Sequence, residues 1–308
     1  MKKVFAKLFR NILRRQTGAR KLKNRVIHLP DDLIKPEGFV VYSGPEESDV
    51  WPAIFIMNTL HMEFPEKKLA VICSKRDRVL FNMLRLRPAV HSYEGRPRIP
   101  DMIEEDSISP ESILVHPYTT VLSADEKVLS GIPCRIRMAP LTHSSPYINF
   151  RVKTKATVYP DILSEMCSTI GLKYDADWKP PVPNRIEELV ENKIAPVSGR
   201  MLPYIVTTPS ALSILEKRKA EIPLRTVSLS GKNSDFDHLD REIKSVIIAD
   251  ATAVLTDSDD QWGDACAHGV PVAGLDRSGN FLKWKDRVPA SNDDEFAEAW
   301  VRLLKKGW

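Results

Sequence analysis

Short apolar stretches typical of β-strands alternate with longer stretches typical of helices, and this alternation limits the possible folds of the chain more than any other feature. The order of strand and helix runs from about residue 38 to 140 and starts again near residue 201. Strands that are joined in sequence through helices run parallel, so the pattern predicts an α/β fold with helices on both faces of each sheet. The restart predicts two Rossmann-like α/β/α domains that face each other across a cleft.

The expected elements can be given by their ranges. Strands are expected at 38–43, 68–74, 112–117, 134–140, 201–209, 225–231, 252–258 and 270–275, and helices at 49–64, 75–87, 123–132, 159–172, 210–222, 237–249, 260–269 and 293–308. Residues from 141 to about 160 are expected to be irregular, and the prolines of 177–188 indicate the approach to a domain boundary. The predicted domains are a basic amphipathic tail (1–30), an N-terminal Rossmann-like domain (31–195), a C-terminal Rossmann-like domain (196–290) and a C-terminal helix (291–308).

The first thirty residues are strongly basic. Of the 45 lysines and arginines, ten lie in residues 1–30, which contain no acid, so the rest of the chain has 35 basic and 41 acidic residues. Apolar residues recur in the tail at helical spacing, opposite the cations, which is typical of a helix that lies on an anionic membrane surface. A helix that docks on the protein body or on a partner fits the pattern equally well. The predicted membrane-surface residues are Lys2, Lys3, Phe5, Phe9, Arg10, Arg14 and Arg15.

Composition disfavours several other classes of protein. Behind the tail the charge balance is acidic, so nucleic acid is not expected as a partner, and a mitochondrial-type targeting peptide fits less well than a surface helix. The four cysteines are far apart and the histidines have no metal-binding spacing, so we expect no disulfide framework, no metal, no cofactor and a reducing cytoplasm. No apolar run has the length of a membrane-spanning helix, and the N-terminus lacks the apolar core of a signal peptide.

Two stretches carry weak motifs in a recognisable order. In residues 38–74, Ser48-Asp49 follows the first strand, Pro52-Ala53 opens the helix, and Glu63-Phe64-Pro65 ends it. This arrangement resembles the opening of the heptosyltransferase-type glycosyltransferases (glycosyltransferase family 9, GT-B fold), where Gly-Asp is usual in the loop. A second stretch, residues 227–275, resembles the C-terminal signature of that family through Leu229, Gly231, Lys232, Ala249-Asp250, Thr256-Asp257 and Gly269-Val270-Pro271-Val272. The resemblance covers roughly residues 38–290.

The resemblance implies an inverting, metal-independent transfer of a sugar from a nucleotide diphosphate-sugar to a lipid-linked saccharide acceptor. It assigns the role of general base to Asp49, because the attacking hydroxyl must lose its proton as the new bond forms. A positioned base accelerates such a step about 10²–10⁴-fold. Asp49 is equally well explained as a helix N-cap, which contributes about 1 kcal/mol.

The donor side departs from the family pattern. Asp259 and Asp260 follow directly after the matched acid, and His268 comes one helical turn later than the histidine of the family. Two acids repel a diphosphate, but they also suit the positive end of a helix dipole, and we expect the second role. A basic phosphate-binding phrase of the family is absent too. The predicted donor-binding residues, each of which fits a cap or a turn as well, are Thr207, Thr208, Ser210, Lys232, Thr256, Asp257 and Ser258.

Two functions are therefore expected as alternatives. The first is a glycosyltransferase in the cytoplasm, peripheral on the inner face of a membrane, with a nucleotide-sugar donor and a saccharide or lipid-linked saccharide acceptor. The second is a GT-B-fold protein that has lost donor chemistry and serves as a binding or assembly module. The matched Asp49 favours the enzyme, and the altered donor motif favours the module.

Overall fold

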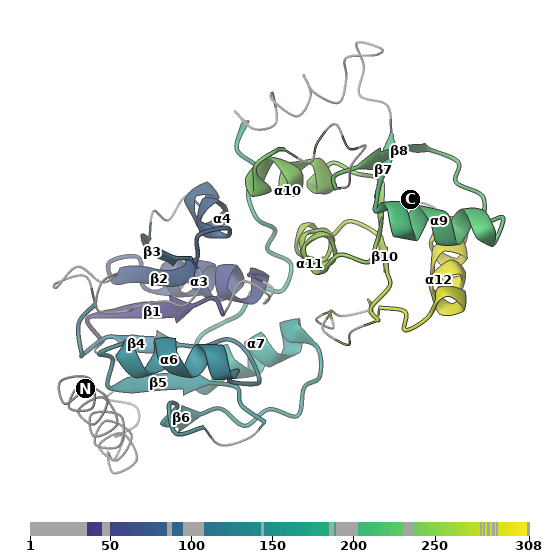
Figure 1. Cartoon of the computed structure of the whole chain (residues 1–308). Helices are drawn as coiled ribbons and strands as arrows, with labels where there is room; N and C mark the ends of the chain where they lie inside the picture. Colours follow the sequence, from purple (N-terminus) through teal and green to yellow (C-terminus); the bar gives the residue numbers. More distant parts are fainter. Residues whose placement is uncertain are drawn as a thin grey trace, which may run out of the picture. The chain divides into compact units, whose positions relative to one another are not determined.

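The computed structural model describes residues 36–44, 50–84, 88–94, 108–142, 145–184, 188, 203–230, 234, 236, 238–277, 279, 281, 284, 287 and 289–306. These residues belong to two compact units (Figure 1). One unit is built from residues up to 78, from 86 to 156 and from 161 to 175, and the other from the remainder. The boundary expected near residue 195 lies outside the described residues, so the exact domain limits stay a prediction.

The first unit contains a six-stranded sheet in the order β3-β2-β1-β4-β5-β6, in which every pairing is parallel. Going outward from β1, the chain adds β2 and β3 on one side, and then β4, β5 and β6 on the other. The order therefore reverses between β1 and β4, which makes this the topological switch point of the sheet. The strands are β1 (Gly38–Tyr42), β2 (Lys68–Ser74), β3 (Ala89–Tyr93), β4 (Ile113–Val115), β5 (Ile136–Ala139) and β6 (Phe150–Arg151).

Helices α3 (Trp51–Glu63) and α6 (Ser123–Gly131) cover opposite faces of this sheet (Figure 1). Right-handed crossovers require this arrangement, because β1 to β2 and β4 to β5 advance in opposite directions. The central strand β1 is buried on both faces: Val40 and Tyr42 point into a core with Val128 and Leu129 of α6. On the other face Phe39 stacks on Phe64, with ring centroids 5.2 Å apart.

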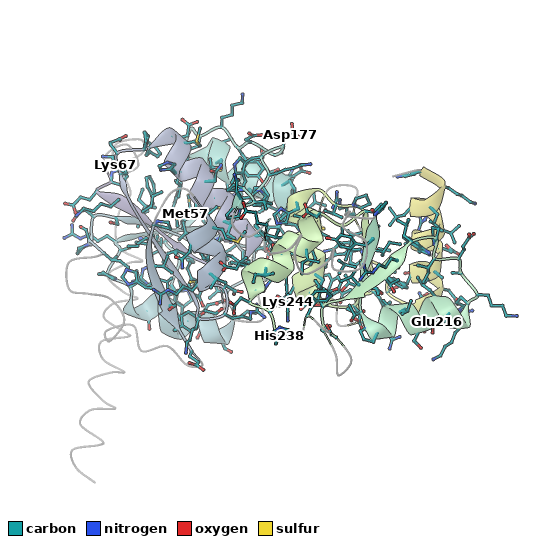
Figure 2. The ribbon with its side chains drawn as sticks, turned by 90° about the horizontal axis from the view of Figure 1, so that it is seen from above. Met57, Lys67, Asp177, Glu216, His238 and Lys244 are labelled. Carbon is teal, nitrogen blue, oxygen red and sulfur yellow. The ribbon has the colours of Figure 1, made fainter. Side chains whose placement is uncertain are left out.

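The remaining helices of this half of the chain are α4 (Arg78–Met83), which follows β2, and α7 (Tyr159–Thr169). The helix α3 is apolar on nearly all sides, as is expected of a buried helix. Its residue Met57 is completely buried among the side chains of the first unit (Figure 2).

The second unit contains a four-stranded parallel sheet in the order β10-β9-β7-β8. Its strands are β7 (Tyr204–Thr207), β8 (Arg225–Ser228), β9 (Ala253–Thr256) and β10 (Val272–Gly274), and its helices are α9 (Pro209–Lys217), α10 (Arg241–Ala249), α11 (Asp259–His268) and α12 (Asp293–Lys306). Here the switch point lies between β7 and β9. Leu215 of α9 and Trp300 of α12 pack in one core against one face of the sheet. The pair α10 and α11 covers the other face (Figure 1).

The expected α/β class and the expected parallel strands are confirmed, whereas the expectation of two domains that face each other across a cleft stays a prediction. Several details of the expectation are wrong. The strand β3 was not expected, because four of its five residues are only partly buried or exposed and form no apolar run. The helix expected at 75–87 begins only at Arg78, because Ser74–Asp77 form a hydrogen-bonded turn. The region expected to be irregular contains the short strand β6.

The helix expected to reach residue 222 ends at Lys217, and Lys219 has a positive φ of 53°. Its neighbours Lys217 and Arg218 are exposed. Glu216, one residue earlier, likewise points into solvent (Figure 2). The helix expected at 123–132 ends at Gly131, and the helix expected at 159–172 ends two residues before Gly171, whose φ is +77°.

Candidate functional site

The predicted donor-binding residues that the structure describes gather at one edge of the second sheet. Thr207 ends β7 and Thr256 ends β9, and these two strands are neighbours. Both strands are parallel, so their carboxyl ends and the following helices α9 and α11 open at the same edge. This edge is the switch point of the sheet, where open α/β sheets bind their ligands.

Thr207 and Thr208 connect β7 to α9. Thr208 is the N-cap of α9, and its Oγ1 accepts a hydrogen bond from the Ala211 amide at 3.4 Å. The Thr207 hydroxyl donates to the Thr208 carbonyl oxygen at 3.1 Å. Both threonines are more than nine-tenths buried. The contact of Thr208 agrees with the capping role, and that of Thr207 with the turn role, that the sequence left open.

Ser210 and Asp257 join the two strand ends directly. The Ser210 hydroxyl donates a hydrogen bond to Asp257 Oδ2, across 47 residues of sequence. Ser210 Oγ also lies 3.5 Å from Thr208 Oγ1. Both Ser210 and Asp257 are exposed, so this pair borders on solvent at the mouth of the switch point.

Thr256 and Ser258 shape the turn from β9 into α11. The Thr256 hydroxyl is buried and accepts a hydrogen bond from the Ser258 amide at 2.9 Å. Ser258 is the N-cap of α11 but its side chain makes no capping hydrogen bond. Helix starts with backbone N–H groups directed at one sheet edge favour an anionic ligand.

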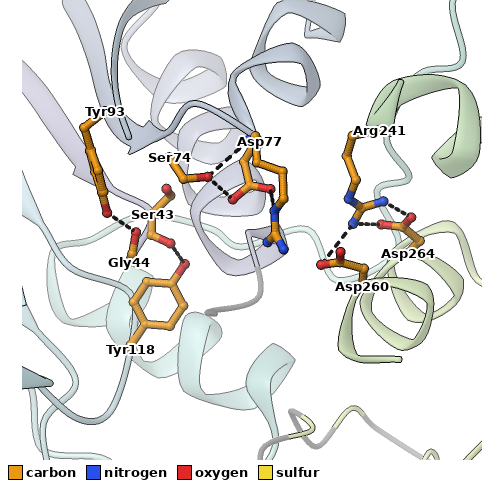
Figure 3. Close-up of polar contacts among 10 residues, drawn as sticks. Ser43, Gly44, Ser74, Asp77, Tyr93, Tyr118, Arg241, Asp260 and Asp264 are labelled. Atoms are coloured by element: carbon orange, nitrogen blue, oxygen red, sulfur yellow. Dashed lines mark hydrogen bonds and ion pairs between the residues drawn. The ribbon is translucent and has the colours of Figure 1, made fainter. Parts of the chain in front are cut away.

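The acids of α11 have a partner that sequence reasoning missed. Arg241, the first residue of α10, forms a two-pronged ion pair with Asp264, in which Nη2 lies 2.7 Å from Oδ1 and Nη1 contacts Oδ2 (Figure 3). Asp260 Oδ1 lies 3.8 Å from the same guanidinium. Asp260 and Asp264 are four residues apart and so share a face of α11. Asp264 therefore stabilises the packing of α10 on α11, and Asp260 of the acidic first turn adds a weaker contact.

His268 does not lie at the mouth of the site. It is buried near the end of α11, and its Nε2 lies 3.1 Å from the Ser245 hydroxyl of α10. Burial, together with the nearby positive charges of Arg241 and Lys179, lowers the pKa of His268 to about 4. A neutral, buried imidazole cannot supply positive charge to a phosphate, so this histidine packs the helix pair.

The switch point of the first unit is also rich in polar groups. The Tyr118 hydroxyl donates to the Ser43 carbonyl oxygen, and the Tyr93 hydroxyl donates to the Gly44 carbonyl oxygen at 2.8 Å (Figure 3). Two tyrosines thereby fix the chain where it leaves β1. The Ser43 hydroxyl is 1% exposed and has no hydrogen-bond partner among the described residues. A buried hydroxyl without a partner is unusual in a native protein.

A buried network lies behind this strand end. The Tyr42 hydroxyl donates to Asp125 Oδ1 at 2.9 Å, and the Leu122 amide donates to Asp125 Oδ2. His116 Nε2 lies 3.8 Å from the same carboxylate. Burial raises the pKa of Tyr42, and the nearby Tyr93 and Asp125 add to that rise. The Asp125 carboxylate therefore stabilises the core through Tyr42 and the start of α6 through the Leu122 amide.

Other predicted site residues lie outside the described residues, and their roles stay predictions. They are the proposed base Asp49, the proposed donor residue Lys232 and the membrane-surface residues Lys2, Lys3, Phe5, Phe9, Arg10, Arg14 and Arg15. The residue after Asp49, Val50, is the N-cap of α3 and makes no side-chain hydrogen bond to the helix.

Within the described part of the chain, no group of three or more His, Cys, Asp or Glu side chains could hold a metal ion. The four cysteines are free thiols and are buried. Among the same residues, none of the helices combines the length and the apolar character needed to cross a bilayer.

The two parallel sheets, each with a switch point, define an α/β protein with two Rossmann-like units. No family model matches the sequence, and no curated protein is detectably similar to it. The likeness to solved structures, by contrast, spans nearly the whole of both chains.

Three solved structures show this likeness. The E. coli ADP-heptose LPS heptosyltransferase II is 14% identical, with a TM-score of 0.53 over 87% of this chain and 99% of that chain. The E. coli heptosyltransferase WaaC with ADP is 9% identical, with a TM-score of 0.55 over 87% and 99%. A glycosyl transferase family 9 protein from Veillonella parvula is 9% identical, with a TM-score of 0.57 over 92% and 100%. These likenesses confirm the resemblance to heptosyltransferase-type proteins at the level of the fold.

Proposed function

We propose that this protein is an inverting glycosyltransferase that moves a sugar from a nucleotide diphosphate-sugar to a saccharide acceptor. The observation that carries the proposal is the meeting of Thr208, Ser210 and Asp257 at the switch point between β7 and β9. Two helices begin at this edge, and helix starts suit a diphosphate. The E. coli heptosyltransferase WaaC, which has a similar fold, is solved with ADP and with ADP-2-deoxy-2-fluoro heptose.

The chemistry of transfer requires an acid-base group and a means of binding the departing diphosphate. Asp49, which follows β1, is the proposed base that accepts the proton of the attacking acceptor hydroxyl. Lys232 is proposed to balance the charge of the leaving nucleotide diphosphate. The tyrosines Tyr93 and Tyr118 support this proposal, because they hold the backbone at Ser43 and Gly44, just before the segment that carries Asp49.

Nucleotide binding tests the donor half of the proposal. The full chain is titrated with ADP, UDP, GDP and CDP while the melting temperature is measured. A nucleotide present at a hundred times its Kd should stabilise the fold by about 2.7 kcal/mol. Asp49→Asn should then abolish turnover with the matching nucleotide sugar and leave the nucleotide affinity unchanged. Loss of turnover and affinity together would point to a structural role for Asp49.

The protein is proposed to act at the cytoplasmic face of a membrane, with the tail of residues 1–30 bound to anionic lipid. Deletion of residues 1–25 should abolish cosedimentation with vesicles that contain phosphatidylglycerol. Vesicles of phosphatidylcholine alone are the control, because a basic amphipathic helix needs the anionic surface for tight binding. Unchanged cosedimentation after the deletion would contradict the anchor.

A specific observation favours the alternative of a binding or assembly module. Three carboxylates, Asp257, Asp259 and Asp260, lie at the edge where a diphosphate would bind, and Ser210 is already hydrogen-bonded to the first of them. Like charges disfavour the binding of a diphosphate. A melting temperature that does not change with any nucleotide would support this alternative.

A further inference from the structure

A small cavity lies beyond the carboxyl ends of β4 and β5 in the first unit. Its volume is about 210 Å³, and it is lined by the segments that follow these two strands and by the first turn of α6. A water occupies about 30 Å³ in the liquid, so the cavity has room for roughly seven waters or one pyranose ring. It lies next to the switch point between β1 and β4, on the ligand-binding edge of the sheet.

The two segments that form the cavity are tied together. The Thr142 amide donates to the Thr119 carbonyl oxygen at 3.0 Å, and the Thr142 hydroxyl donates to the same oxygen at 3.3 Å. Ser145 Oγ accepts a hydrogen bond from the Tyr147 amide at 3.2 Å. These contacts hold the walls in place without using the Thr120 hydroxyl or the hydroxyl proton of Ser145. The cavity is therefore a preformed site with hydroxyl groups available to a ligand.

Two adjacent acids of α6 have different roles. Asp125 is 2% exposed and is bound by Tyr42 and by the Leu122 amide. Glu126 is exposed and lines the cavity, and its carboxylate makes no hydrogen bond or ion pair with any other described residue. Of the described lining residues, Glu126 is the only charged one. The apolar side chains of Val121, Leu141 and Pro146 complete the wall.

We propose that this cavity binds one sugar residue of the acceptor, and that the sugar it takes carries no acidic group. Hydroxyl donors and acceptors beside an apolar wall match the hydroxyl groups and C–H faces of a pyranose. The carboxylate of Glu126 accepts hydrogen bonds from sugar hydroxyls and repels a uronic acid or a phosphorylated sugar. The role as an acceptor site rests on the proposed transferase function, whereas the sugar binding itself does not.

Three soluble probes test the charge preference of the cavity. They are methyl glucoside, its 2-amino counterpart and methyl glucuronide, each measured by saturation-transfer NMR with the full chain at pH 7. We expect the first two to bind and the glucuronide to bind at least several-fold more weakly. Equal binding of all three, or no binding of any, would overturn the proposal.

Variants of the lining residues test whether the sugar binds in this cavity. Glu126→Lys should reverse the preference, so that the glucuronide binds more tightly than the glucoside, and Thr120→Val should weaken binding of the glucoside several-fold. Asp161→Asn is the matched control, because Asp161 is an exposed first-turn acid of α7 in the same unit and should leave all three affinities unchanged. If Glu126→Lys does not fold, Glu126→Gln should still remove most of the discrimination between glucoside and glucuronide. Unchanged discrimination in Glu126→Gln would contradict the proposal.

The outcomes separate this inference from the proposed function. If nucleotides stabilise the fold but no sugar binds at Glu126 and Thr120, the proposed sugar site is contradicted and the proposed transferase function is not. If a sugar binds at these residues but no nucleotide changes the stability, the proposed sugar site is supported and the proposed transferase function is contradicted.

Discussion

The Ser210 hydroxyl donates a hydrogen bond to the Asp257 carboxylate and so joins the ends of two neighbouring strands, β7 and β9, at the switch point of their sheet. The contact brings together two segments that the sequence indicates separately. It also raises a direct question about function, because a carboxylate and a diphosphate compete for the same hydroxyl.

Replacement of Ser210 by Ala should weaken the binding of a nucleotide diphosphate about twofold to tenfold. The reason is the loss of one hydroxyl donor, which typically contributes about 0.5–1.5 kcal/mol. Isothermal titration calorimetry with the stabilising nucleotide measures the change. The control is Ser213→Ala, one turn further along α9, which should leave the affinity unaltered. Equal affinity for wild type and Ser210→Ala would remove Ser210 from the donor site.

Replacement of Asp264 by Asn should destabilise the second unit by about 3–5 kcal/mol. The substitution leaves the largely buried guanidinium of Arg241 without its main counter-ion, which is the costly way to break a buried ion pair. Urea unfolding measures the loss. Asp260→Asn is the control, because its carboxylate is 38% exposed and 3.8 Å from Arg241, and it should cost less than about 1 kcal/mol. Similar losses in both variants would contradict the assignment of Asp264 as the main partner.

Because of His268, the second unit should be less stable in acid than at neutral pH. Burial lowers the pKa of His268 to about 4, below its ordinary value of 6.5. Between these two values the unfolded chain binds a proton that the folded chain does not, so the stability is fully present above about pH 6.5 and falls as the pH is lowered toward 4. The loss amounts to at most about 3 kcal/mol. Below pH 4 both states are protonated and no further loss arises from this group.

An NMR titration of the imidazole checks the pKa, and urea unfolding at several pH values checks the stability. His268→Gln should flatten the decline between pH 6.5 and 4, whereas His238→Gln should not, because His238 is exposed. An imidazole that titrates near pH 6.5 would show that His268 is solvated and would contradict the buried contact with Ser245.

Replacement of Gly274 by Ala should destabilise the second unit by about 1–3 kcal/mol through overpacking. A Cβ at this position would lie 2.3 Å from Cε3 of Trp262, a fully buried ring, so the ring or the strand must move. Thermal unfolding measures the loss. Trp262→Leu in the same chain should make the Gly274→Ala substitution less costly, since the smaller side chain leaves room. A cost that is the same in both backgrounds would mean that the ring is not the obstacle.

The sequence predicted most of the fold because buried parallel strands are short, apolar and regularly spaced between amphipathic or apolar helices. It did not predict β3, whose residues Val90, His91 and Ser92 are only half-buried and therefore carry no apolar signal. It also placed the start of α4 too early, because Ser74 and Asp77 form a hydrogen-bonded turn just before the helix. Such turns depend on side-chain hydrogen bonds that periodicity does not reveal.

By itself, the sequence determined the α/β class, the parallel strands and the two groups of residues at strand ends that became the candidate site. Hydrophobic periodicity encodes these features locally, so no knowledge of distant contacts was needed. Only the tertiary structure decided that Ser210 meets Asp257, that Arg241 takes up the acids of α11, and that His268 is buried between helices. These pairs are 23 to 47 residues apart in sequence. Their partners are chosen by the packing of whole helices and strands, which no short stretch of the chain specifies.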